Sequence, residues 1–162
     1  MINLIFAMDE NYGIWKNNNL CWHLKQDLNF FSEKTKWNTV IMWRNTWNSL
    51  PEKFKPLPWR KNIIISSSLK SSYNYQVYTN LQQAIKDNPG DIFLIWWKRI
   101  YQEGIKYADK IYITKVYWKF DCNVFLDEDF IKTIKKDFKL CFRSGKKKEY
   151  DIYFEFLEYV KV

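Results

Sequence analysis

Uninterrupted apolar runs alternate along this chain with segments whose apolar residues recur at helical spacing. The apolar runs predict buried strands at residues 2–8, 39–42, 62–66, 77–78 and 92–95, because a strand covered on both faces has no polar side. Helical spacing predicts helices at residues 25–35, 44–50, 80–86 and from 98 onward. Leu24, Leu28 and Phe31 mark the apolar face of the first helix, and Thr79 is the expected cap of the third.

The last third of the chain follows a different pattern. Residues 110–116 predict another strand, and residues 132–142 and 150–159 predict an antiparallel pair around a turn at 144–149. Residues 9–20 are polar and rich in asparagine, which predicts a loop. The whole pattern predicts a single α/β domain over residues 1–162. We expect a central mixed, mostly parallel sheet of about eight strands, about four flanking helices and a C-terminal antiparallel hairpin.

Length and hydropathy narrow the class of protein further. At 162 residues the chain is long enough for one domain with its own core. Its apolar runs are far shorter than the roughly 20 residues of a membrane-spanning helix. The first ten residues lack the basic region and cleavage site of a signal peptide. We therefore expect a cytoplasmic protein without a membrane partner, and a monomer, because no long exposed apolar seam is evident.

Charge and cysteine content suggest what the protein binds and what it does not. The formal net charge is +8, which suits a nucleic acid, an anionic small molecule or a lysine-rich solvated surface. The lysines are scattered, so we favour the solvated surface and expect no nucleic-acid partner. Cys21, Cys122 and Cys141 are widely spaced and form no CxxC pair. This spacing predicts free thiols, buried or partly buried.

Two residues could carry acid–base chemistry. Asp27 lies near the start of the first predicted helix among apolar and aromatic residues, and burial would raise its pKa toward a range useful for proton delivery. An aspartate in a first helical turn also serves the helix dipole, so the position alone decides nothing. His23 is the only histidine, and no catalytic or metal cluster can be built around it, which favours a structural or solvent-facing role.

Three strand ends have residues that suit an anion. Residues 40–47 form a strand followed directly by a helix that begins with Arg44 and Thr46. Ser66, Ser67 and Ser68 follow the third strand, and the strand at 92–95 runs into the helix at Lys98. Ligands of open α/β sheets bind at the carboxyl ends of strands. Together these ends predict one extended, phosphate-bearing ligand.

Several segments in sequence order resemble dihydrofolate reductase over essentially the whole chain. They are GIWKNNNLCWHLKQDLNFF (13–31), VIMWRNTWNSL (40–50), PLPWRKNIIIS (56–66), IFLIWWKRIYQE (92–103) and KIYITKV (110–116). The resemblance implies NADPH-dependent reduction of dihydrofolate. The alternatives are a related pyrimidine-pathway reductase, a basic anion- or nucleic-acid-binding module, and an inactive chain.

The resemblance also implies residue roles. Asp27 corresponds to the carboxylate that holds the pterin and promotes protonation of its N5, with Trp22 and Thr114 completing the hydrogen-bond network and Leu20 at the tip of a mobile loop. The implied folate-pocket residues are Ile5, Phe31, Leu50, Leu57, Arg60, Ile95 and Tyr101, and Arg60 would bind the glutamate carboxylate. The implied NADPH-binding residues are Ala7, Ile14, Trp15, Trp43, Arg44, Asn45, Thr46, Ser66, Ser67, Trp96, Trp97, Lys98, Arg99 and Ile100. No metal is implied.

The tryptophans depart from the family pattern. Seven of the nine stand where the family has glycine: Trp15, Trp37, Trp43, Trp59, Trp96, Trp97 and Trp118. Trp22 and Trp47 stand where the family has tryptophan. The chain has only 4 glycines in 162 residues, against an average of about 7%. We hypothesise that one codon, UGA in the simplest case, means glycine in the source organism and has been translated here as tryptophan.

The chain also departs from the family pattern at three smaller features. The family has a cis peptide at the positions of Trp96 and Trp97, which two tryptophans would make costly. It often has proline in place of Cys21, and an Asp-Thr pair in place of Asn123 and Val124. The difference at Asn123 and Val124 leaves open whether the loop containing Leu20 is still held to the loop containing Asn123.

Overall fold

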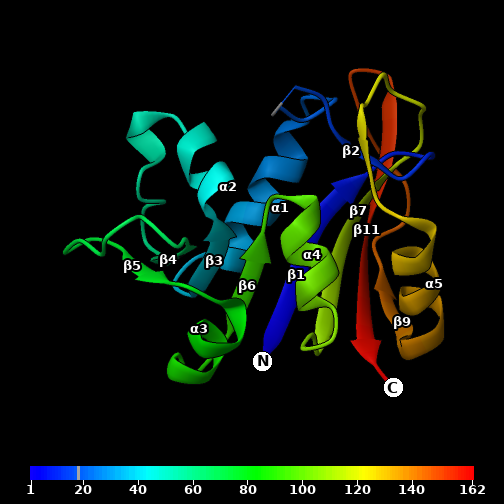
Figure 1. Cartoon of the computed structure of the whole chain (residues 1–162). Helices are drawn as coiled ribbons and strands as arrows, with labels where there is room; N and C mark the ends of the chain where they lie inside the picture. Colours follow the sequence, from blue (N-terminus) through cyan, green and yellow to red (C-terminus); the bar gives the residue numbers. More distant parts are fainter. Residues whose placement is uncertain (18) are drawn as a thin grey trace. The chain divides into compact units, whose positions relative to one another are not determined.

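The computed structural model describes residues 1–17 and 19–162. They form two compact units, one of Met1–Leu4 with Ser32–Ala108 and one of Ile5–Phe31 with Asp109–Val162. Strand β1 (Ile2–Met8) contributes its first residues to one unit and its last to the other. The elements of each unit can be followed by colour in Figure 1.

Parallel strands dominate the first unit. Strand β3 (Thr39–Trp43) pairs with β4 (Lys61–Ile65) and β6 (Ile92–Ile95), and β4 also pairs with β5 (Gln76–Tyr78), all in parallel. The helices are α2 (Arg44–Ser49), α3 (Leu81–Asp87) and α4 (Lys98–Gly104), with a short 3-10 helix at Glu52–Phe54. Gly104 allows α4 to approach β6 closely, because a Cβ there would lie 2.2 Å from Leu94 Cδ1.

Antiparallel strands dominate the second unit. The long strand β11 (Ile152–Lys161) pairs with β7 (Lys110–Val116), β9 (Phe138–Arg143) and the short β10 (Lys147–Glu149), each antiparallel. A separate ladder joins β2 (Gly13–Trp15) to β8 (Val124–Phe125). Helix α1 (Lys25–Thr35) begins in this unit, and α5 (Glu128–Asp137) lies alongside β9 (Figure 1). The predicted α/β class, with mixed strands and a C-terminal antiparallel pair, is confirmed.

Several predicted elements were wrong. Residues 132–142 were expected to be a strand, but α5 covers their first half, because Phe130, Ile131 and Ile134 are buried at helical spacing. The described residues contain five α-helices, in line with the about four that were expected. The expected central mixed sheet of about eight strands is confirmed. The short strands β2, β8 and β10, of two or three residues each, were not expected. Such short ladders leave too few alternating positions to be recognised in a sequence.

Three local details were also wrong. The loop predicted at residues 9–20 contains β2, which forms only by pairing with β8. Helix α3 is capped by Asn80 instead of Thr79, since the Asn80 side chain accepts a hydrogen bond from Gln83 N at 2.8 Å. Leu28 was placed on the apolar face of α1, yet 41% of its surface is exposed.

The prediction of three free thiols was wrong. Cys21 and Cys122 form a disulfide, while Cys141 is free and exposed. The bonded pair lies 101 residues apart in the sequence. Spacing along the chain therefore held no sign of the bond, which depends on how the second unit folds.

Candidate functional site

A buried carboxylate is the centre of the site in the second unit. Asp27 lies in the first turn of α1 and is 8% exposed. Thr114 Oγ1, on β7, donates a hydrogen bond to Asp27 Oδ1 at 2.7 Å, and Trp22 Nε1 lies 3.5 Å from Oδ2. The structure thus brings Thr114 to Asp27 and Trp22, which lie 87 residues or more earlier in the sequence. Leu20, also predicted here, packs against the apolar cluster that contains Trp22.

The surroundings of Asp27 raise its pKa above the ordinary value for an aspartate. Burial is the largest cause, because removal from water disfavours the charged form. The hydrogen bonds from Thr114 and Trp22 act in the opposite direction, and the negative charge of Glu149 adds a smaller upward effect. The carboxyl group therefore keeps its proton to a higher pH than an exposed aspartate, as a proton donor near neutral pH requires.

Glu149 and Asp9 are two polar residues of this unit that the sequence analysis missed. Glu149 accepts hydrogen bonds from the backbone N–H groups of Lys25 and Gln26, at 2.6 and 3.1 Å, and so caps α1 just before Asp27. Asp9 is 1% exposed and accepts from the backbone N–H groups of Asn11, Gly13 and Phe120. An acidic residue directly after a buried strand, where a chain reversal begins, was the available signal for Asp9.

The predicted folate-pocket residues are divided between the two units. Ile5, on β1, is buried and Phe31, on α1, is half-buried, and both belong to the second unit. In the first unit, Leu50 is half-buried, and Leu57, Ile95 and Tyr101 are buried. Of the predicted cofactor residues in the second unit, Ile14 is 1% exposed, and Ala7 and Trp15 are half-buried.

Arg60, in the first unit, is a half-buried cation held in one orientation. Its Nε donates to Thr35 Oγ1 at 3.0 Å, its Nη1 to the Pro58 carbonyl at 2.6 Å, and its Nη2 to the Ser32 carbonyl at 2.9 Å. These partners fix the plane of the guanidinium group. A fixed, planar guanidinium suits recognition of a carboxylate.

A cavity of about 180 Å³ lies at three strand ends of the first unit. Its lining residues come from β3 and α2, from the end of β4 and from α4: Trp43, Arg44, Asn45, Ile65, Ser66, Ser67, Ser68, Trp97 and Arg99. The lining contains two guanidinium groups and three serines but no carboxylate. Arg44 Nη1 donates to Ser68 Oγ, and Ser66 Oγ accepts from the backbone N–H of Leu69 at 3.0 Å. Arg44, Asn45 and the three serines, all predicted to hold an anion, thus line one cavity, whereas Thr46 and Lys98 do not line it.

Two tryptophans line the same cavity and fit it poorly. Trp43 Nε1 is buried and has no hydrogen-bond partner among the described residues, which is costly for an indole N–H. Its ring lies 3.9 Å from the Arg99 guanidinium carbon. The cavity is smaller than the roughly 300–1,000 Å³ of a typical small-molecule pocket. Indole groups therefore take up space where the polar residues converge.

Four tryptophans have backbone conformations that favour glycine. The φ angles of Trp37, Trp59, Trp96 and Trp97 are 67°, 62°, 47° and 150°. L-residues with a bulky side chain rarely adopt positive φ. Trp37 and Trp59 are also 71% and 65% exposed, which is unusual for so large an apolar side chain. All four belong to the seven positions where the family pattern has glycine.

The junction between β6 and α4 differs from its expected form in one respect. A cis peptide was implied between Trp96 and Trp97, but the only cis peptide among the described residues is Lys55–Pro56. Trp96 N donates to Tyr101 Oη at 2.8 Å, and Thr46 Oγ1 donates to the Trp96 carbonyl. Tyr101 and Thr46 thus fix the junction from inside the unit. Ile100 is buried and Lys98 is half-buried on α4.

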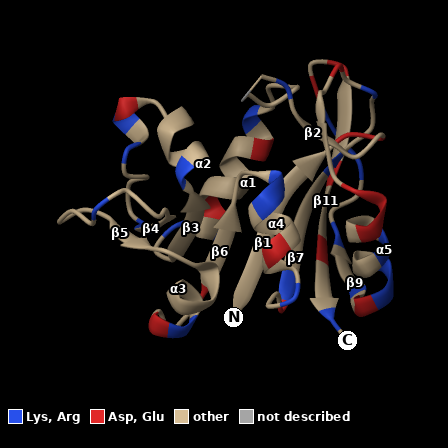
Figure 2. Cartoon of the chain, viewed as in Figure 1, with Lys and Arg blue, Asp and Glu red and all other residues tan. Residues whose placement is uncertain are grey.

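Surface charges are mixed on two of the helices (Figure 2), and the described residues contain no cluster of metal ligands. Figure 2 shows Lys and Arg interspersed with Asp and Glu on α3 and on α5. Across residues 1–17 and 19–162, no three His, Cys, Asp or Glu side chains gather as metal ligands would. No helix in the described part of the chain is long and apolar enough to cross a lipid bilayer.

Comparison with known proteins gives a consistent result. A family model described as dihydrofolate reductase matches residues 1–161. The dihydrofolate reductase of Bacillus subtilis is 36% identical over 166 residues, which cover 99% of this chain and 95% of that protein. The dihydrofolate reductase of Schistosoma mansoni is 34% identical over 82% of this chain and 83% of its own length.

A solved structure shows the same fold. Dihydrofolate reductase from Enterococcus faecalis, complexed with NADP(H) and RAB-propyl, superimposes with a TM-score of 0.85 at 24% identity. The superposition covers 99% of this chain and 96% of that one.

Proposed function

Because the chain belongs to the dihydrofolate reductase family, we propose that it reduces dihydrofolate to tetrahydrofolate with NADPH. The observation that carries the proposal is the buried Asp27 carboxyl with its partners Thr114 and Trp22. A buried carboxyl with a raised pKa can bind a nitrogen heterocycle and favour its protonation. The guanidinium group of Arg60, held in one orientation, suits the carboxylate of the substrate.

The chemistry at Asp27 follows from its hydrogen bonds. Thr114 and Trp22 hold the two carboxyl oxygens in fixed directions, so the substrate ring meets a preorganised partner. Burial raises the pKa of Asp27, so its carboxyl group keeps a proton to a higher pH than an exposed aspartate and would promote protonation of N5 of the pterin ring. Bound NADPH would supply the hydride.

The residues of the first unit fit NADPH only in part. Arg44, Asn45, Ser66 and Ser67 offer donors for an anion such as the 2′-phosphate. Trp43 and Trp97 line the same cavity. The buried Trp43 N–H has no hydrogen-bond partner among the described residues, so its burial is unfavourable. The donor set therefore fits the cofactor, whereas the indole groups do not. The chain with tryptophan at these positions should bind NADPH poorly.

We further propose that the native protein has glycine at positions 15, 37, 43, 59, 96, 97 and 118. Positive φ at four of these positions and the unpartnered Trp43 N–H both support the proposal. Replacing the seven tryptophans would raise the glycine count from 4 to 11 in 162 residues, close to the average of about 7%. The native gene decides the matter directly, because UGG codons at these positions would exclude a reassigned codon.

Absorbance at 340 nm tests the proposed activity. We expect the glycine-bearing chain to oxidise NADPH in the presence of dihydrofolate, and the tryptophan-bearing chain to do so weakly or not at all. The control omits dihydrofolate. Absence of turnover in both chains, with both folded, would exclude the proposed activity and favour an anion-binding module instead.

Arg44→Gln should change cofactor preference in the glycine-bearing chain. We expect about a 10-fold or larger loss of affinity for NADPH, because a charged donor to the 2′-phosphate is removed. Affinity for NADH, which lacks this phosphate, should change little, and fluorescence titration with both cofactors measures the difference. Equal losses for the two cofactors would mean that Arg44 does not contact the 2′-phosphate.

A further inference from the structure

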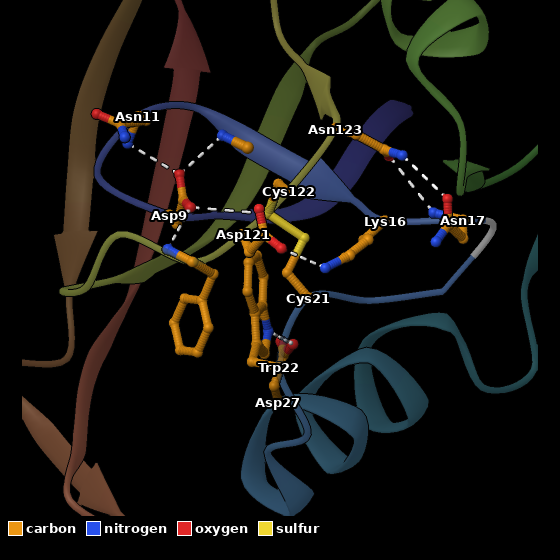
Figure 3. The surroundings of a disulfide bond; sticks show 12 residues. Asp9, Asn11, Lys16, Asn17, Cys21, Trp22, Asp27, Asp121, Cys122 and Asn123 are labelled. Carbon is orange, nitrogen blue, oxygen red and sulfur yellow. Dashed lines mark hydrogen bonds and ion pairs between the residues drawn. A yellow bond between two sulfur atoms is a disulfide. The ribbon is translucent and has the colours of Figure 1, made fainter.

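We propose that Cys21 and Cys122 form a reversible thiol–disulfide site that sets how firmly the segment from Asn19 to Trp22 is held beside Asp27. Figure 3 shows the disulfide where this segment meets the segment that contains Asp121 and Asn123. Both segments belong to the second unit.

The other links between the two segments are weak at the Cys21 end. The β2–β8 ladder holds the chain near Trp15, where the Asn123 backbone N–H donates to the Trp15 carbonyl at 2.9 Å. Beyond it, Lys16 pairs with Asp121, whose side chain is 91% exposed. An exposed ion pair of this kind contributes little to stability. Asn17 and Asn123, both exposed, add two hydrogen bonds at 3.0 and 3.4 Å. The disulfide is thus the covalent link between the two segments.

The disulfide lies next to the residues around Asp27. Cys21 directly precedes Trp22, which is 5% exposed and whose Nε1 lies 3.5 Å from Asp27 Oδ2. The Trp22 ring packs against Phe120 with 5.5 Å between centroids. Cys122 belongs to the same buried cluster as Trp22. Breaking the bond would release Trp22 from a covalent tether one residue away while leaving its apolar contacts in place.

The two sulfur atoms differ in access. Cys21 is half-buried, whereas Cys122 is 8% exposed and packs directly against Gly13. A Cβ at Gly13 would lie 2.7 Å from Cys122 Cβ and 2.8 Å from its Sγ, so this contact requires glycine. A reducing thiolate therefore reaches the Cys21 sulfur first.

The Asp9 carboxyl group lies beside the Cys122 sulfur, which is the leaving group in the exchange. Asp9 Oδ2 lies 3.7 Å from Cys122 Sγ. After release, the Cys122 sulfur takes up a proton from solvent and can donate to Asp9 as a thiol. The backbone N–H groups of Asn11, Gly13 and Phe120 hold the Asp9 carboxylate in place in either state.

The reaction is a two-electron exchange with a dithiol. One thiolate of the dithiol attacks Cys21 Sγ, the protein S–S bond breaks, and Cys122 leaves and is protonated. The second thiol of the reagent then attacks the mixed disulfide, which releases Cys21 as a thiol and the reagent as a cyclic disulfide. Two electrons and two protons pass to the protein, and a small-molecule disulfide reverses the reaction.

Thiol counting and amide hydrogen exchange test the site on the folded chain. After incubation with oxidised or reduced dithiothreitol, alkylation and mass spectrometry should find one free thiol, Cys141, in the oxidised form and all three in the reduced form. Exchange in the peptide covering residues 15–22 should be about 10-fold faster in the reduced form, because local opening becomes easier. Failure of dithiothreitol to open the bond in the folded chain, or equal exchange in both forms, would overturn the proposal.

Two matched cysteine variants serve as controls. Cys21→Ser should exchange like the reduced protein under both conditions, whereas Cys141→Ser should respond like the parent chain. The parent chain itself needs no mutation, so misfolding of a variant does not affect the main comparison. A redox response that persists in Cys21→Ser would assign it to another group and overturn the proposal.

The effect on turnover rests additionally on the proposed function. Reduction should lower kcat/KM of the glycine-bearing chain about 3- to 10-fold, because Trp22 is held less firmly against Asp27. If neither form turns over, the proposed function fails, while thiol counting and exchange still decide the redox site. Faster exchange with unchanged kcat/KM would overturn the link to Asp27.

Discussion

Replacing the seven tryptophans at positions 15, 37, 43, 59, 96, 97 and 118 by glycine should tighten NADPH binding at least about 100-fold, or about 2.7 kcal/mol. Trp43 and Trp97 line the cavity where the anion-binding side chains converge, and glycine would open that space. Trp96 and Trp97 also have positive φ, which costs about 1–3 kcal/mol at each bulky residue. Fluorescence titration of both chains with NADPH measures the change.

Partial replacements separate the cavity from backbone strain. Trp43→Gly with Trp97→Gly should restore most of the affinity for NADPH. Trp37→Gly with Trp59→Gly should raise the Tm with little effect on affinity, because these residues are exposed and their φ angles suit glycine. The strain relieved there exceeds the loss of their ring contact at 5.3 Å, a contact of about 1 kcal/mol.

Glycine at Trp47, where the family has tryptophan, should lower stability instead of raising it. Trp47 is 8% exposed and lies in α2, with its ring 4.8 Å from that of Tyr75. Trp47→Gly should lower the free energy of unfolding by about 3–5 kcal/mol, because it leaves a cavity. Micromolar or tighter NADPH binding by the tryptophan-bearing chain would contradict the main prediction.

Asp27→Asn should lower kcat/KM of the glycine-bearing chain for dihydrofolate about 100- to 1,000-fold, the usual range for loss of an acid–base group. The amide can still accept a hydrogen bond from Thr114, so the variant should fold. Steady-state assays at 340 nm measure the loss. Activity of the parent chain should fall as the pH rises through the raised pKa of Asp27, while the variant lacks that dependence.

The same pKa predicts a pH effect on stability. Burial raises the pKa of Asp27 in the folded chain above its unfolded value. Its contribution to the free energy of unfolding is therefore present at low pH and is lost as the pH rises through the folded pKa. Thermal unfolding of Asp27→Asn should lack this loss, which shows separately from kinetics that the carboxyl group is buried.

Asp129→Asn is the matched control for Asp27→Asn. Asp129 also lies in the first turn of a helix, α5, but is exposed. If Asp27 served only the helix dipole, both substitutions would have the same small effect, typically below about 1 kcal/mol. Comparable kcat/KM for the two variants would therefore remove Asp27 from the chemistry.

Local sequence patterns determined most of the elements around the site. Strands β1, β6 and β7 and helix α1 have the bounds that their apolar runs and helical spacing predicted. Several residues that line the cavity at the ends of β3 and β4 had been singled out in the sequence, because hydroxyl and guanidinium groups directly follow those strands. These signals lie within one or two turns or pleats, so they depend only on neighbouring residues.

The tertiary structure decided which distant residues of the chain contact one another. Asp27 looks the same in the sequence whether it serves a helix dipole or a buried site, and only its contact with Thr114, 87 residues away, favours the second. Segments distant in the sequence are likewise joined by the Cys21–Cys122 bond, by the β2–β8 ladder and by the hydrogen bond from the Phe120 backbone N–H to Asp9. The sequence alone led to the hypothesis that seven tryptophans stand at glycine positions, and positive backbone φ at four of them supports it. Contacts of this kind depend on how the chain folds back on itself, which no local spacing records.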